Sequence, residues 1–160
     1  MDLLRIFAVL SVILTGTIHL VTYLGINPLS IWPSVMVMHV ITGVIFGLFV
    51  VLTKTGEGGK ERKALGHATA SMKRVAGFLI VYAGLNFGWC NYINEHSRPS
   101  ICDGQTVLMT RGCIVRRVLT ENEYDYHQRI EMRSWSGFWI FFNAMTLLGI
   151  ASRTRENQQL

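Results

Sequence analysis

Charged residues are scarce in this chain, and one long stretch has none. Of its 160 residues, 16% are Asp, Glu, Lys or Arg, against about 25% in an average soluble domain. Residues 6–53 carry no charged side chain, and half of all residues are hydrophobic. A soluble core does not need so long an uncharged run, and a disordered chain is poorer in apolar residues. The sequence therefore excludes disordered and fibrous classes and indicates an integral membrane protein in contact with the lipid bilayer.

Four uncharged segments are long enough to cross a membrane as helices. A bilayer core needs about 20 apolar residues in helical form. The sequence Gly25-Ile26-Asn27-Pro28 interrupts the first long run, because Gly and Asn end helices and Pro loses a hydrogen bond inside one. We therefore expect an all-α fold, a four-transmembrane-helix bundle. It forms a single membrane domain, residues 1–160, with spans at about 6–24, 30–53, 75–94 and 134–152.

The distribution of positive charge orients these spans. Nine of the fifteen Lys and Arg residues, including all four lysines, fall at the two ends of the chain and in the loop 54–74. Lys and Arg near span ends are enriched on the cytoplasmic side, and the four tryptophans lie near the opposite ends of the spans. We expect a bacterial inner-membrane protein with both termini cytoplasmic and residues 95–133 periplasmic. The basic surplus faces anionic lipid and does not indicate a nucleic-acid partner.

The outer loop carries the pattern of a small β-hairpin between the third and fourth spans. Gln105–Met109 and Ile114–Leu119 are rich in β-branched and apolar residues, and a turn containing Gly112 separates them. Cys102 and Cys113 flank the first of these strands, on the side of the membrane where disulfides persist. We expect them to form a disulfide bond. The alternative is two reduced thiols in a reducing compartment or an inverted topology.

A helix-capping pattern follows the hairpin. Thr120 and Glu123 have the spacing of a capping box, in which each side chain bonds the backbone N–H of the other residue. No helix-breaking residue follows before Ser136-Gly137. We therefore expect one long helix that begins near Glu121 and continues into the last span.

Two stretches near the C-terminal end have a familiar pattern. The first contains Asp103-Gly104 and Thr120-Glu121-Asn122-Glu123-Tyr124, and the second is Arg133-Ser134-Trp135-Ser136-Gly137 at the start of the last span. Together they resemble an uncharacterised group of small bacterial four-span inner-membrane proteins. The resemblance implies the fold and the compartment given above, and it brings no activity. The two hairpin cysteines depart from the usual pattern of that group.

Two histidines fall at membrane depth. The helical rise of 1.5 Å per residue places His19 and His39 about 8–13 Å below the outer surface. Ionisable residues inside the membrane are functional candidates, and two imidazoles from facing helices suit a bis-histidine haem b or part of a copper or zinc site. The simpler interpretation is a hydrogen bond from each ring to a neighbouring hydroxyl or carbonyl group. Contact with a quinone or a lipid is a third possibility.

Small and amide side chains inside the spans predict where helices pack. Two G-x-x-x-G pairs, in the second and third spans, let helices approach closely, either within the bundle or between subunits. An asparagine near the middle of each of the last two spans is expected to form a hydrogen bond to another helix. The expected packing positions are Gly43, Gly47, Gly84, Gly88, Asn86 and Asn143.

No catalytic motif is recognisable. The chain has no H-E-x-x-H, G-x-S-x-G, P-loop or C-x-x-C pattern. The lack of C-x-x-C argues against a four-helix thiol oxidoreductase, and uncharged spans argue against a pump or an ion-coupled transporter. We assign no catalytic residue and no metal ligand, and expect a non-catalytic accessory or assembly subunit, or a partner-binding component, of a larger membrane complex. The alternative is a haem-b or metal-binding electron-transfer anchor that uses His19 and His39.

Overall fold

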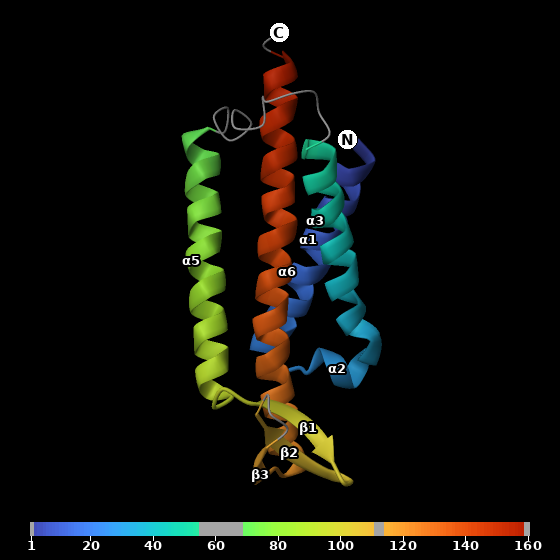
Figure 1. Ribbon diagram of the computed structural model, residues 1–160, viewed down its shortest axis with the longest axis vertical. Helices are drawn as coiled ribbons and strands as arrows, with labels where there is room; N and C mark the ends of the chain where they lie inside the picture. The colour runs from blue at the N-terminus through green and yellow to red at the C-terminus, as the bar shows by residue number, and fades with distance from the viewer. Residues whose placement is uncertain (1, 55–68, 111–113, 159–160) are drawn as a thin grey trace. The chain divides into compact units, whose positions relative to one another are not determined.

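The computed structural model describes residues 2–54, 69–110 and 114–158, and within them the chain is mostly helical (Figure 1). The long helices are α1 (Asp2–Tyr23), α3 (Val37–Lys54), α5 (Ala70–Ile93) and α6 (Glu121–Gln158). A short helix α2 (Pro28–Ile31) and a 3-10 helix η1 (Pro33–Met36) lie between α1 and α3. Three strands lie between α5 and α6: β1 (Arg98–Cys102), β2 (Gln105–Met109) and β3 (Val115–Val118).

Three helical segments in the described part of the chain are long and apolar enough to cross a membrane: Leu3–Tyr23, Pro33–Leu52 and Glu121–Ser152. Many of the large apolar side chains of α1 and α3 are exposed, as in helices that lipid surrounds. In the third segment the charged residues end at Arg133, so its apolar part is 134–152. These helices fit an integral membrane protein.

Helix α5 covers all but the last residue of the predicted span 75–94 but is not one of these three segments. Its apolar stretch includes Asn86, Asn91 and two tyrosines, which lower its hydropathy. The predicted architecture is therefore confirmed only in a coarser form, a mostly helical chain with three candidate spans and a small sheet. The four-helix membrane bundle stays a prediction.

The predicted second span, 30–53, includes a break near its start. The Asn27 side chain accepts the backbone N–H of Leu29 at 3.1 Å and caps α2, whose first residue is Pro28. This helix ends at Ile31 with Trp32 as its C-cap, because the next residue, Pro33, has no N–H to continue the hydrogen bonding. A 3-10 turn follows, and the regular helix α3 begins only at Val37.

The strands form one antiparallel sheet in the order β1-β2-β3. The pairing of β2 with β3 confirms the predicted hairpin, although residues 111–113 lie outside the described residues. Strand β1 is not predicted by the sequence analysis. It pairs with β2 along its whole length, from Arg98 opposite Met109 to Cys102 opposite Gln105. The connecting residues Asp103-Gly104 both have positive φ (50° and 77°), as in the two-residue turns of tight hairpins.

The start of α6 has the predicted capping box. The backbone N–H of Glu123 donates to Thr120 Oγ1 at 3.3 Å, and the backbone N–H of Thr120 donates to Glu123 Oε2 at 2.9 Å. These bonds satisfy donors that have no partner inside the helix. The helix then continues without interruption from Glu121 to Gln158, which confirms the prediction of one long helix.

The chain divides into two compact units. One contains Met1–Thr15, Met36–Tyr82 and Trp139–Leu160, and the other contains Gly16–Val35 and Ala83–Phe138. In the first unit, buried apolar side chains from α1, α3 and α6 form a cluster: Leu4, Ala8, Ile45 and Ile150, with Phe49 and Leu147 packed against it. In the second unit, buried apolar side chains come mainly from the sheet and the first half of α6: Val107, Leu108, Leu119, Ile130 and Met132.

Candidate functional site

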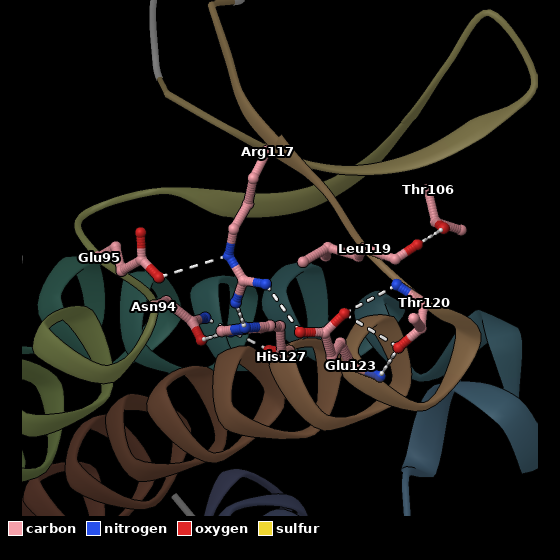
Figure 2. Close-up of polar contacts among 8 residues, drawn as sticks. All are labelled: Asn94, Glu95, Thr106, Arg117, Leu119, Thr120, Glu123 and His127. Atoms are coloured by element: carbon pink, nitrogen blue, oxygen red, sulfur yellow. Dashed lines mark hydrogen bonds and ion pairs between the residues drawn. The ribbon is translucent and has the colours of Figure 1, made fainter.

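Arg117 on β3 connects the sheet to the first turns of α6 (Figure 2). Its Nη1 donates to Glu123 Oε1 at 2.8 Å, and its Nε lies 3.6 Å from Glu95 Oε1. Its Nη2 lies 3.2 Å from His127 Nε2. The guanidinium is therefore held by acceptors from two elements, the turn between α5 and β1 and the helix α6.

His127 is neutral in this arrangement. A guanidinium has donors only, so Nε2 of His127 accepts and carries no proton. Nδ1 then carries the proton and donates to Asn94 Oδ1 at 2.9 Å, while Asn94 Nδ2 donates to the carbonyl oxygen of His127 at 3.3 Å. Both residues are buried. This reciprocal pair attaches the end of α5 to α6.

The contacts shift the pKa values of these groups, which lie outside the apolar segment 134–152. Burial and the positive charge of Arg117 lower the pKa of His127. The backbone N–H of Thr120 and the Arg117 side chain lower the pKa of Glu123 to about 2. The hydrogen bond to Glu123 raises the pKa of Arg117. A neutral imidazole thus lies next to a fixed ion pair.

A second polar cluster ties the end of α1 to α6. Arg133 Nη2 donates to the carbonyl oxygen of Thr22 at 2.7 Å, and the guanidinium lies 4.0 Å from the centroid of the Tyr23 ring. A cation at this position stabilises the carbonyl groups at the C-terminal end of a helix. After the helix, Asn27 Nδ2 donates to Asp125 Oδ1 at 2.8 Å and to Gln128 Oε1 at 3.1 Å.

His19, one of the two predicted ligands, is buried beside α6. Its Nδ1 lies 2.7 Å from Ser136 Oγ. That hydroxyl donates its single proton to the carbonyl oxygen of Met132 at 2.7 Å, so it accepts from Nδ1–H of His19. A Cβ atom at Gly137 would lie only 2.5 Å from Asn86 Nδ2. A larger residue at position 137 would therefore require the Asn86 amide to move where the three helices meet.

His39, the second predicted ligand, lies in the other unit. Its Nδ1 is 3.1 Å from the carbonyl oxygen of Met36, and its ring meets Trp139 edge-on with 4.9 Å between ring centroids. Each histidine thus makes a hydrogen bond within its own unit, and their joint use as ligands stays a prediction. Among residues 2–54, 69–110 and 114–158, no group of three or more His, Cys, Asp or Glu residues is arranged to hold a metal ion.

The predicted disulfide between Cys102 and Cys113 is not present. Cys102 is a free thiol whose Sγ lies 3.8 Å from Asp103 Oδ2, and Cys113 lies outside the described residues. Cys102 pairs with Gln105 at one end of β2, whereas the connection to β3 leaves the other end after Met109. A strand of this length separates its ends by about 13 Å, and the two Cα atoms of a disulfide are at most about 7 Å apart. Cys102 therefore lies at the end of β2 that is remote from the connection to β3.

The four predicted packing glycines lie on open helix surfaces. A Cβ atom at any of them would meet no heavy atom within 4 Å in the described part of the chain. On α5, two of these glycines line a shallow groove together with Leu85, Trp89 and Tyr92. The open positions are Gly43, Gly47, Gly84 and Gly88.

The two predicted asparagines form hydrogen bonds to other helices. Asn86 Nδ2 on α5 donates to the carbonyl oxygen of Arg133 on α6 at 3.0 Å. Asn143 Nδ2 on α6 donates to Thr42 Oγ1 on α3 at 3.2 Å. Both asparagines are buried, so each bond satisfies an amide donor away from solvent.

Sequence reasoning missed strand β1 and the contacts of Arg117. The Asp103-Gly104 pair is a strong hairpin signal, and it could have located a strand before it. The partners of Arg117 had no local signal, because Glu95 and His127 come from other parts of the chain.

Comparison with known proteins finds no matching family model, no matching curated protein and no matching solved structure. The resemblance to small bacterial four-span membrane proteins therefore stays a prediction. The fold itself defines a broad class: a mostly helical chain with three helices long and apolar enough to span a membrane and a small antiparallel sheet.

Proposed function

We propose that this chain is a non-catalytic integral membrane protein that assembles with other membrane subunits through the open glycine face of α5. The observation that supports this proposal is the surroundings of Gly84 and Gly88. Both glycines are exposed, and they are separated by about one helical turn. In lipid, small residues at this spacing allow a second helix to approach closely and gain van der Waals contact.

The shape of the surface around these glycines suits a transmembrane helix of another subunit. The groove that contains Gly84 and Gly88 is also lined by Trp89 and Tyr92, whose side chains are 61% and 70% exposed. Aromatic side chains of this size add contact area beside a backbone that a partner helix can reach. Gly43 and Gly47 on α3 offer a second open pair of the same spacing.

The proposal is tested by blocking the glycine face. The protein is purified from its host membrane in a mild detergent, and its complexes are separated by native electrophoresis with the co-purifying proteins identified. We expect the unchanged protein to migrate in a complex and Gly84→Leu or Gly88→Leu to migrate as the isolated chain, because a leucine side chain prevents close approach.

Gly16→Leu is the matched control. Gly16 also has open surroundings among the described residues, but no glycine lies four residues before or after it. This variant should keep the complex. If Gly84→Leu and Gly43→Leu both leave every complex intact, helix-mediated assembly is wrong.

The same preparation tests the haem-b alternative at His19 and His39. An oxidised-minus-reduced absorption spectrum should be flat if both histidines serve only as hydrogen-bonding groups. Soret and α bands at near one haem per chain, lost in His19→Ala and His39→Ala, would instead make this chain an electron-transfer anchor.

A further inference from the structure

A cavity of about 320 Å³ lies in the second unit, among the last turn of α5, the turn that leads to β1, and α6. Pockets for small ligands have volumes of roughly 300–1,000 Å³, so this one holds a group of modest size. Phe87 and Trp135 supply apolar wall, while Asn91 and Ser97 supply polar groups. A cavity with both kinds of wall suits a ligand that is itself partly polar.

Two opposite charges line this cavity from different elements. Arg98 comes from β1 and is exposed, whereas Glu131 comes from α6 and is partly buried. Glu131 accepts a hydrogen bond from Trp135 and lies within the influence of the positive charge of Arg98, while the ion pairs found among the described residues are those of Arg117. A charge withdrawn from water is stabilised by a counter-charge. The cavity therefore offers a carboxylate for a cation and a guanidinium for an anion.

The neighbouring aromatic side chains indicate the depth of the cavity in a membrane. Trp89 and Tyr92 lie on the exposed surface of α5 shortly before the helix ends at Ile93, and Trp135 lines the cavity itself. Trp and Tyr concentrate where the apolar core of a bilayer meets the lipid headgroups. A headgroup is therefore the polar group most available at this position.

We propose that this cavity binds a phosphoethanolamine group, with the ammonium at Glu131 and the phosphate at Arg98, and that a membrane phospholipid supplies it. Arg guanidinium groups bind phosphate oxygens through charge-assisted hydrogen bonds. Asn91 adds a neutral donor, because its Nδ2 donates one of its two protons to the Phe87 carbonyl oxygen and keeps the other. A primary ammonium has three N–H donors and can donate to the Glu131 carboxylate. The proposal is independent of the proposed assembly function, because the cavity and the glycine groove share no lining residue.

Three lipids with the same acyl chains distinguish this site from general lipid contact. Phosphatidylcholine has the same charges as phosphatidylethanolamine but no N–H donor, and phosphatidylglycerol has no cation. Delipidated protein in detergent is incubated with each lipid, and bound lipid is counted by native mass spectrometry. We expect phosphatidylethanolamine to bind about tenfold more tightly than the other two. Equal retention of the three lipids would overturn the proposal.

A soluble ligand separates the two sources of the group. O-phosphoethanolamine is titrated into the delipidated protein and followed by calorimetry. Weaker binding than that of the lipid supports a membrane source. Binding as tight as that of the lipid, or tighter, overturns the membrane source and assigns the cavity to a soluble zwitterion.

Variants locate the binding in the cavity. Glu131→Gln keeps the size of the side chain and removes its charge, so it should weaken phosphatidylethanolamine binding about tenfold. Arg98→Gln should do the same, while Arg116→Gln, at an exposed arginine of β3 that does not line the cavity, should leave binding unchanged. If Glu131→Gln still preferred phosphatidylethanolamine to the other two lipids by the same factor, the assignment of the ammonium to Glu131 would be wrong. If a variant fails to fold, the comparison of the three lipids on the unchanged protein still tests whether phosphatidylethanolamine is preferred.

Discussion

At the level of single residues, His127 shows how neighbours set the state of a titratable side chain. Its Nε2 accepts from Arg117 and its Nδ1–H donates to Asn94. A proton added to Nε2 would place a donor against the donors of a guanidinium. The contacts between the sheet, α5 and α6 therefore require the neutral form of this imidazole.

This requirement predicts a stability that falls with acidification. Because burial and Arg117 lower the pKa of His127 below 6.5 in the folded chain, the unfolded chain takes up a proton first as the pH falls. The neutral form of His127 contributes to the free energy of unfolding at pH values above 6.5, its ordinary pKa. This contribution is lost as the pH falls below that value. We expect the thermal unfolding temperature in detergent, followed by circular dichroism, to fall between about pH 7.5 and about pH 5.5.

His127→Gln removes this titrating group and should make the dependence shallower, while the second buried histidine, His19, remains in the variant. Glu123 does not contribute in the same range, because a carboxyl with its pKa lowered from 4.5 to about 2 loses its stabilising effect only below pH 4.5. The same fall in His127→Gln as in the unchanged protein would show that another group is responsible.

At the level of elements, the start of α6 combines a cap with a connection to the sheet. Thr120 and Glu123 satisfy each other's backbone N–H groups, and the second carboxylate oxygen of Glu123 accepts from Arg117. The Glu123 carboxylate thus caps the start of α6 with one oxygen and holds β3 to the helix with the other.

Loss of this cap should weaken the sheet end of α6. Thr120→Ala removes the hydroxyl that accepts the N–H of Glu123, and losses of this kind cost about 1 kcal/mol. Hydrogen exchange of the first α6 amides should accelerate in this variant. Asn122→Ala, at an exposed position in the same helical turn, is the control and should not accelerate exchange. Equal effects of both substitutions would contradict a specific capping role.

At the level of the whole molecule, the number of times the chain crosses the membrane depends on α5. Its 24 residues correspond to about 36 Å of helix, which exceeds the roughly 30 Å of a bilayer core. It contains no charged residue after Arg74, although its asparagines lower its hydropathy. We therefore expect α5 to cross the membrane as a fourth span.

The position of the two ends of the chain tests this expectation. Four crossings place both ends on one side, and three crossings place them on opposite sides. A fluorescent reporter that matures only in the cytoplasm, fused in turn to each end, should be fluorescent at both, because Lys and Arg cluster beside both ends. Fluorescence at one end only would show three crossings.

Much of the helical structure could be predicted because its causes are local. Uncharged runs marked the membrane helices, Asn27-Pro28 marked a break, and Thr120 with Glu123 marked the start of α6. Helical hydrogen bonds join residues four apart, so a short sequence pattern is enough to predict a helix or one of its ends. The exact start of α3 was less predictable, because Pro33 interrupted an otherwise continuous apolar run.

Pairings between distant residues could not be read in this way. Strand β1 contains Arg98 and Pro99, which have weak strand preference, and it forms because β2 offers a complete register opposite it. Cys102 is a free thiol at the β1–β2 turn, where it lies opposite Gln105. The partners of Arg117 and the walls of the charged cavity also come from segments far apart in sequence. Long-range contacts carry no periodic signal along the chain, so only the folded arrangement reveals them.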